Sequence, residues 1–135
     1  MMGWLSKLFG GKPTKLVRLE GDGDYECEVV GESHYQDALG CITGGKTEDG
    51  HELECEALLE REPHNRNDPN AITVRIDGKL VGYLPRHHAK AMTIIFNKHE
   101  LAGAYADAVI VGGWSGRKGR KAEGHFGVRL DIPVR

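Results

Sequence analysis

The chain has 135 residues, of which 39% are hydrophobic and 28% are charged, and its formal net charge is -2. This length suits one domain with one modest core, and the composition excludes a chain that is disordered throughout. Nineteen glycines and only 7% aromatic residues favour short strands and tight turns over a bundle of long helices.

The first predicted element is a short N-terminal helix. Four apolar residues recur there at helical spacing: Trp4, Leu5, Leu8 and Phe9. Because such a segment is too short to be stable alone, it either frays, docks on its own domain, or contacts a membrane surface or a partner. We therefore distinguish an N-terminal extension, residues 1–20, from a domain that spans residues 21–135.

The domain is expected to begin with a strand at residues 27–31, followed by a helix over residues 33–43, where apolar side chains recur at helical spacing. A turn at residues 48–50 then leads into a strand at residues 53–60. Alternation along this strand puts four residues on one face: Leu53, Cys55, Ala57 and Leu59.

Residues 71–84 form the clearest local pattern, a predicted β-hairpin. Apolar and polar residues alternate before Asp77 and Gly78, and an Asp-Gly pair between two apolar runs favours a type I′ turn, in which both residues take positive φ. An amphipathic helix is expected next, beginning near Pro85. Its predicted inward residues are Ala89, Met92, Ile95 and Phe96.

A final pair of strands is predicted at residues 105–113 and 125–134, on either side of a loop rich in glycine and basic residues. The loop begins at Trp114 and contains Arg117 and Lys118. A run of charges is ordinarily a solvated loop, but an adjacent aromatic residue favours contact with a single strand of nucleic acid. The wider charge pattern agrees, since residues 1–62 carry 14 acidic and 6 basic residues, whereas residues 63–135 carry 6 acidic and 12 basic ones.

One tempting motif is rejected. Residues 40–47 have the spacing of a phosphate-binding P-loop, but that motif requires a buried strand before the loop and a helix after it. Here a predicted helix precedes the loop, and Glu48, Asp49 and Gly50 follow it. We therefore expect no nucleotide hydrolysis, and no set of nucleophile, base and orienting group indicates another enzyme.

Metal and cofactor sites are not expected either. His87 and His88 are adjacent and cannot both face one site from a regular helix, and the acids between Asp22 and Glu28 lack the pattern of a calcium loop, so they are either a weak cation site or a solvated face. The three cysteines form no CxxC pair and are expected to be buried thiols in a reducing compartment. With no apolar run long enough for a membrane span, we expect a cytoplasmic protein.

Two segments together resemble the HIRAN domain family. The first is LEREPHNRNDPNAITV, at residues 59–74, and the second is VGYLPRHHA, at residues 81–89. An upstream element, VVGESHYQ, stands where the family has an aromatic-rich turn after a strand. The resemblance covers about residues 26–132 and leaves the N-terminus unmatched.

This resemblance implies a mainly β fold with accessory helices (α+β), a small OB-like β-barrel with one or two packed helices. It also implies a function, because the eukaryotic members grip the 3′ end of single-stranded DNA. By position, Asn65 and Asp68 would contact the terminal nucleotide, Tyr35 and Tyr83 would stack on bases, and Arg86 would bind a phosphate.

The residues themselves leave alternatives open. The run of Asn and Asp can be only a structured connector, and each tyrosine can equally be a core residue. Where the eukaryotic members have an arginine and two aromatic residues, this chain has Ser33, His34 and Tyr35. We expect a non-catalytic domain that binds single-stranded nucleic acid, with DNA as the expected polymer. The alternative is a protein-interaction module that recruits a DNA-repair or other partner, for which the N-terminal segment is the candidate surface.

Overall fold

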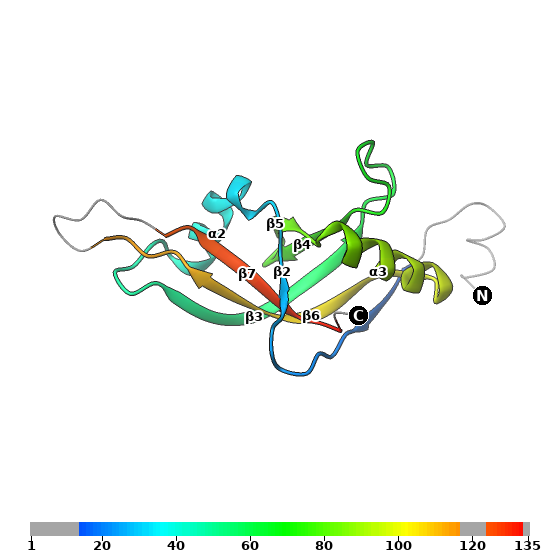
Figure 1. Cartoon of the computed structure of the whole chain (residues 1–135), viewed down its shortest axis with the longest axis horizontal. Coiled ribbons are helices and arrows are strands. Elements are labelled where there is room, and N and C mark those ends of the chain that lie inside the picture. Colours follow the sequence, from blue (N-terminus) through cyan, green and yellow to red (C-terminus); the bar gives the residue numbers. More distant parts are fainter. Residues whose placement is uncertain (1–13, 117–123, 134–135) are drawn as a thin grey trace.

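A computed structural model describes residues 14–116 and 124–133, in which one curled sheet carries two helices (Figure 1). The strands are β1 (Lys15–Arg18), β2 (Cys27–Glu28), β3 (His51–Arg61), β4 (Ile72–Ile76), β5 (Lys79–Tyr83), β6 (Leu101–Gly112) and β7 (Phe126–Asp131). The helical elements are the 3-10 turn η1 (Glu32–His34), α2 (Gln36–Thr43) and α3 (Arg86–Lys98). The predicted mainly β fold with accessory helices is therefore confirmed.

The sheet curls into a half-barrel. Its strand order is β2-β7-β6-β3-β4-β5, and β1 lies parallel to β6, off this path. The two ends of the order meet at an isolated bridge between Val30, just after β2, and Tyr83, the last residue of β5. The Val30 amide donates to the Tyr83 carbonyl at 2.8 Å, and the Tyr83 amide donates to the Val30 carbonyl at 2.9 Å. This bridge brings the residues after β2 beside the end of the 72–83 hairpin.

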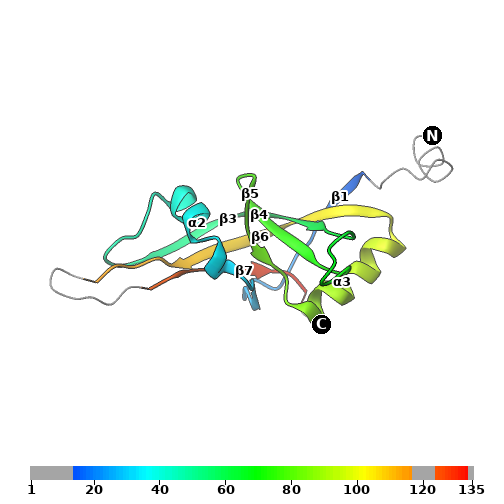
Figure 2. The ribbon, with the colours of Figure 1, turned by 90° about the horizontal axis from the view of Figure 1, so that it is seen from above.

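The core lies between the inner face of the sheet and the helices. Along β3, the predicted inward face is buried only in its second half: Ala57 and Leu59 are fully buried, Cys55 is half-buried and Leu53 is 40% exposed. Each helix adds a fully buried side chain to the same core cluster, namely Leu39 from α2 and Phe96 from α3. In Figures 1 and 2, α2 lies toward one end of the sheet and α3 toward the other.

The predicted hairpin is confirmed at its turn, where Asp77 has φ 51° and Gly78 has φ 75°. The prediction for the second helix was wrong at one position, since Ile95 is 45% exposed and Thr93 is buried. The buried stripe of α3 runs through residues 89, 92, 93 and 96, and position 95 falls outside it. Thr93 is tolerated in the core because its hydroxyl donates to the Asn70 carbonyl at 3.2 Å.

Strand β1 had no counterpart in the sequence analysis. It lies within residues 1–20 and pairs with β6, with Lys15 opposite Leu101 and Arg18 opposite Tyr105. The predicted N-terminal helix lies outside the described residues. Among the helices of the described chain, none combines the length and apolar character that crossing a membrane requires.

The segment with P-loop spacing, residues 40–47, has the structural surroundings that the sequence analysis expected, which differ from those of a P-loop. Residues 40–43 are the last four of α2, Gly44 ends that helix in a left-handed conformation, and the next regular element is the strand β3. The loop therefore follows a helix and precedes a strand, the reverse of the order that places amides and a helix N-terminus around phosphate.

The expectation of buried thiols holds for one cysteine only. Cys27 is buried, Cys55 is half-buried and Cys41 is exposed on α2, and all three are free. Desolvation raises the pKa of the Cys27 and Cys55 thiols to about 11, so both stay protonated at neutral pH. Cys41 is exposed because it lies two residues from the buried Leu39, on the other side of a short amphipathic helix.

Candidate nucleic-acid interface

The segment between β3 and β4 is a rigid turn built by Asn and Asp side chains. The side-chain oxygen of Asn65 accepts hydrogen bonds from the amides of Asn67 at 2.9 Å and Asp68 at 3.1 Å. A carboxylate oxygen of Asp68 in turn accepts from the Asn70 amide at 3.0 Å. These local bonds fix the backbone of the turn, as expected for a structured connector. They leave Asp68, which is half-buried, with unused acceptor positions.

A carboxylate joins this turn to the end of the hairpin. Glu62, half-buried just after β3, accepts a hydrogen bond from the Asn65 side-chain amide at 2.7 Å. The same oxygen accepts from the Tyr83 hydroxyl at 3.2 Å, and the second carboxylate oxygen lies 3.4 Å from that hydroxyl. Two residues predicted to contact nucleic acid, Asn65 and Tyr83, are therefore bound to one side chain. We call these three residues the Glu62 network.

The pKa of Tyr83 is raised above that of an ordinary tyrosine. Desolvation, the negative charge of Glu62 and the hydrogen bond to it, together with a smaller contribution from the nearby Tyr35 phenol, raise the pKa of Tyr83 to about 12. The two predicted stacking residues thus have their hydroxyl groups together. Because Tyr83 is neutral at physiological pH, its ring adds no negative charge beside a polynucleotide.

This shift predicts a loss of stability at high pH. The folded-state pKa lies above the ordinary value of 10, so the stabilising contribution of the neutral phenol is complete below pH 10 and disappears as pH rises through about 12. Urea unfolding across this window should show a steeper loss for the wild type than for Tyr83→Phe, which has no phenol to ionise at this position. Equal slopes would contradict the shift; the comparison cancels the other tyrosines and the thiols.

Arg86, the predicted phosphate ligand, is exposed at the first residue of α3. His87 and His88 follow it with ring centroids 4.0 Å apart, and desolvation together with His87 lowers the pKa of His88. The first turn of α3 holds no acidic residue, although a helix N-terminus favours negative charge. A bound anion would therefore be stabilised both by Arg86 and by the helix dipole.

The remaining predicted residues lie in three places. His34 is exposed in η1, directly before Tyr35. Trp114 is 39% exposed beyond the end of β6, where it forms an isolated bridge to Thr47 and accepts a backbone hydrogen bond from Gly124 at 2.9 Å. Arg117 and Lys118 lie outside the described residues.

The structure does not place Trp114 beside the Glu62 network. Trp114 follows the end of β6 that pairs with the start of β3, whereas Glu62 follows the last residue of β3. A strand of this length separates its two ends by about 30 Å. Figures 1 and 2 show these ends at opposite sides of the molecule, with the 62–71 segment on the side of α3.

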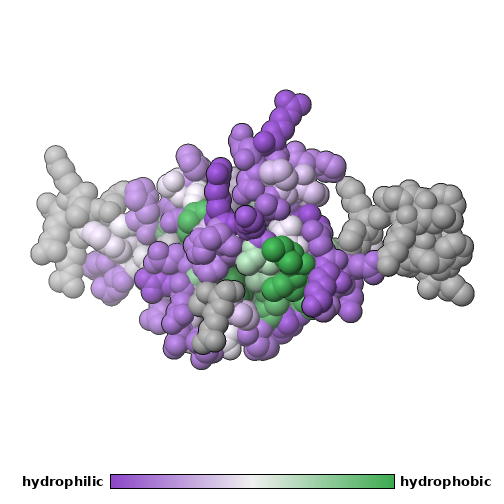
Figure 3. Space-filling view, turned by 45° about the vertical axis from the view of Figure 1, so that its right-hand side comes forward, coloured by the Kyte–Doolittle hydropathy of each residue, from purple (hydrophilic) through white to green (hydrophobic). Residues whose placement is uncertain are grey.

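Five acidic residues of the first half lie on the outer face of the sheet: Glu28, Glu52, Glu54, Glu56 and Glu60. Three arginines there take part in ion pairs: Arg18 binds Glu20, Glu56 and Asp107, Arg75 lies 3.5 Å from Glu60, and Arg129 lies 3.7 Å from Glu28. The helices cover the other side of the sheet, where α3 presents Arg86. The ion pairs of Arg18, Arg75 and Arg129 thus belong to the strands, whereas Arg86 belongs to α3. Figure 3 shows that the surface it displays is mostly hydrophilic, with small apolar patches.

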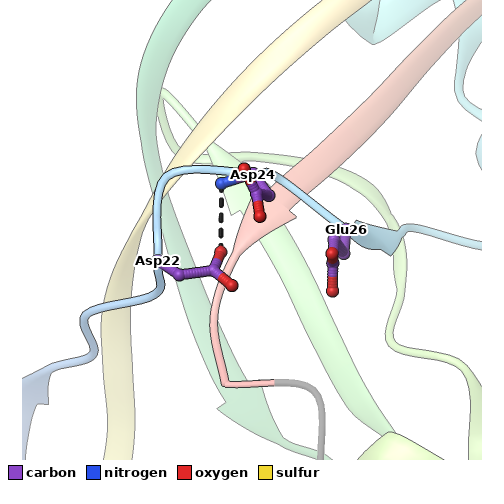
Figure 4. A group of neighbouring side chains, drawn as sticks. All are labelled: Asp22, Asp24 and Glu26. Carbon is purple, nitrogen blue, oxygen red and sulfur yellow. Dashed lines mark hydrogen bonds between the residues drawn. The ribbon is translucent and has the colours of Figure 1, made fainter.

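One group of side chains has the composition of a cation site. The carboxylates of Asp22, Asp24 and Glu26 lie within 4.8 Å of one another, all three residues are exposed, and the Asp24 amide donates to Asp22 at 3.1 Å (Figure 4). Calcium takes six to eight oxygen ligands, so water would have to complete the shell. Of the two interpretations drawn from the sequence, the exposure of these residues fits the solvated face.

Glu62 is the residue that sequence reasoning missed. It was part of the stretch that resembles the family, but its carboxylate was given no role. The available signal was its position three residues before Asn65, a spacing that brings side chains together in a tight turn. Nothing local could have indicated Tyr83, which is 21 residues away in the chain.

Comparison with known proteins gives one family and two solved structures. The HIRAN domain family matches residues 22–110. The crystal structure of a protein from Lactobacillus plantarum is 20% identical over 78% of this chain and 90% of that one, with a TM-score of 0.42. The crystal structure of the HIRAN domain of human HLTF is 20% identical over 66% of this chain and 82% of that one, with a TM-score of 0.30. No curated protein matches the chain.

Proposed function

Because this chain belongs to the HIRAN domain family, we propose that it is a non-catalytic module that binds the 3′ end of single-stranded DNA. One observation carries the proposal: Glu62 accepts hydrogen bonds from both Asn65 and Tyr83, and the Tyr35 phenol is near enough to contribute to the raised pKa of Tyr83. Side chains expected to contact one nucleotide thus come from the residue between η1 and α2, from the end of β5 and from the 62–71 turn. The fold assembles them although they are far apart in sequence.

Each side chain has a distinct role in this proposal. The Tyr35 and Tyr83 rings offer stacking surfaces, which are worth about 1 to 3 kcal/mol per base and tolerate any sequence. Asp68 and the Asn65 turn offer hydrogen-bonding groups to the terminal sugar. Arg86 and the N-terminus of α3 supply the positive end for a phosphate. His34 adds a second ring next to Tyr35, in place of a family aromatic.

The position of Trp114 adds an expectation about strand length. A strand whose end is held at Tyr83 would need to cross about 30 Å of the molecule before it reached Trp114 and the basic loop. A short strand would therefore engage only the tyrosines, Asn65, Asp68 and Arg86. Longer strands would gain the contacts of Trp114, Arg117 and Lys118.

Fluorescence anisotropy with labelled single strands tests the proposal. We expect binding that weakens as salt rises, and tighter binding to a strand with a free 3′ hydroxyl than to the same strand with a blocked 3′ end. Weak binding that depends neither on salt concentration nor on the state of the 3′ end would contradict the proposal. The protein-interaction alternative would gain if deletion of residues 1–12 abolished the capture of a partner and left DNA binding intact.

A charge variant pair makes this test specific. Arg86→Gln should weaken binding and reduce the slope of log affinity against log salt by about 0.7, the change expected for one phosphate contact on a single strand. Arg75→Gln removes the same charge from the outer face, where Arg75 pairs with Glu60, and should leave the slope unchanged. Equal effects of both variants would show that only net charge matters.

A further inference from the structure

Among the described residues, Glu62 alone accepts hydrogen bonds from both the Asn65 side chain and the Tyr83 hydroxyl. Its carboxylate receives the Asn65 amide at 2.7 Å and the Tyr83 hydroxyl at 3.2 Å. Hydrogen bonds to a charged acceptor are stronger than those between neutral groups, and a half-buried location limits competition from water. The two donors are therefore held at a fixed separation before any ligand arrives.

The two donors differ in how firmly their own segments hold them. The side-chain oxygen of Asn65 accepts hydrogen bonds inside its own turn, so the turn sets the orientation of the Asn65 side chain. The side-chain amide nitrogen of Asn65 donates to Glu62. The backbone of Tyr83 is fixed by its bridge to Val30, and its hydroxyl is held by the hydrogen bonds to Glu62. The carboxylate thus links the Asn65 turn to the end of β5.

The charge of a glutamate side chain suits position 62. A carboxylate only accepts hydrogen bonds, and both neighbours can donate, so every polar group in the network has a suitable partner. A second acidic group at Tyr83 would be disfavoured beside it, which keeps the ring neutral and suited to stacking. The negatively charged carboxylate of Glu62 thereby accepts hydrogen bonds from two donors within the protein.

From this geometry we infer that Glu62 is a positioning residue: without being assigned a contact with nucleic acid, it sets the orientation of Tyr83 relative to Asn65 in the binding surface. The inference rests on the proposed function, because the oriented surface is the one that would receive the terminal nucleotide. Preorganisation of this kind improves affinity by removing the entropy cost of ordering the two side chains on binding.

Three variants of the full chain test this role: Glu62→Ala, Glu62→Gln and Glu60→Gln. Glu62→Ala removes both acceptors and should weaken binding to a single strand with a free 3′ end about 10-fold or more. Glu62→Gln keeps one acceptor oxygen and should recover affinity to within about threefold of the wild type. Glu60→Gln is the matched control: Glu60 lies two residues earlier, on β3, and pairs with Arg75 on the outer face, so this variant should bind like the wild type.

A second readout separates positioning from general support of the fold. Tyrosinate absorbance, with Tyr83→Phe used to assign the signal, should show the pKa of Tyr83 falling from about 12 toward 10 in both Glu62 variants and unchanged in Glu60→Gln. If Glu62→Ala bound as tightly as the wild type, or lost affinity without any change in the pKa of Tyr83, the inference would be wrong while the proposed function stood. If the wild type itself failed to bind single-stranded DNA, both the inference about Glu62 and the proposed function would be wrong.

Discussion

Replacing Gly82 with alanine should lower the free energy of unfolding by about 2 to 4 kcal/mol. Two effects combine at this position. Gly82 has φ 155°, which L residues rarely adopt, and a Cβ atom there would lie 2.4 Å from Val29 Cγ1 and 2.7 Å from the Val30 carbonyl oxygen. The backbone of the neighbouring strand cannot move away without breaking the bridge between Val30 and Tyr83.

Urea unfolding of the purified variant measures this effect, and the chain offers a matched control. Gly40 lies inside α2, where an added Cβ would come no closer than 4.0 Å to Phe126. Gly40→Ala should therefore raise stability by about 0.5 to 1 kcal/mol, because alanine suits a helix interior better than glycine. A Gly82→Ala protein as stable as the wild type would show that the two chain segments do not approach this closely.

Replacing Tyr83 with leucine should weaken binding to single-stranded DNA by about 10- to 100-fold, the value of one lost stacking contact. Leucine keeps an apolar side chain at the end of β5 but offers no aromatic face. Anisotropy titrations at one fixed salt concentration measure the loss. Tyr83→Phe keeps the ring and loses only the hydrogen bonds to Glu62, so its affinity should fall between those of the wild type and the leucine variant.

Tyr105→Leu is the control variant, because it replaces a tyrosine with leucine outside the proposed binding surface. Tyr105 is half-buried on β6 opposite Leu58, on the outer face of the sheet. Its replacement should leave affinity for DNA unchanged. If Tyr83→Leu bound like the wild type while it remained folded, Tyr83 would be a packing residue, and the stacking role would have to be sought elsewhere.

Local patterns were sufficient for most of the secondary structure. The Asp77-Gly78 turn, the alternation along β3 and the start of α3 near Pro85 each depend on neighbours in sequence, so short-range sterics and periodicity indicated them. The error at Ile95 shows the limit of this approach. Helical spacing alone allowed either side of the stripe, and only the packing of α3 in the folded chain, where Thr93 donates to Asn70 across 23 residues, shows which side is buried.

The candidate site was predictable only in part. Asn65, Asp68 and Tyr83 were proposed from the family resemblance, and the turn chemistry around Asn65 follows from the residues themselves. Glu62 was missed because its second partner, Tyr83, is distant along the chain. Trp114 was grouped with the same surface because sequence carries no distance, and only the length of the β3–β6 pair shows how far away it lies.

The sequence by itself determined the repertoire of strands, helices and turns, the glycine needed at position 78 and the excess of basic residues in the second half, since each of these depends on a residue's own chemistry and its near neighbours. The tertiary structure alone decided that β1 joins β6, that Val30 meets Tyr83, and that one carboxylate holds a turn and a hairpin together. Such contacts arise from the curl of the whole sheet, which depends on every strand at once, and no local pattern encodes it.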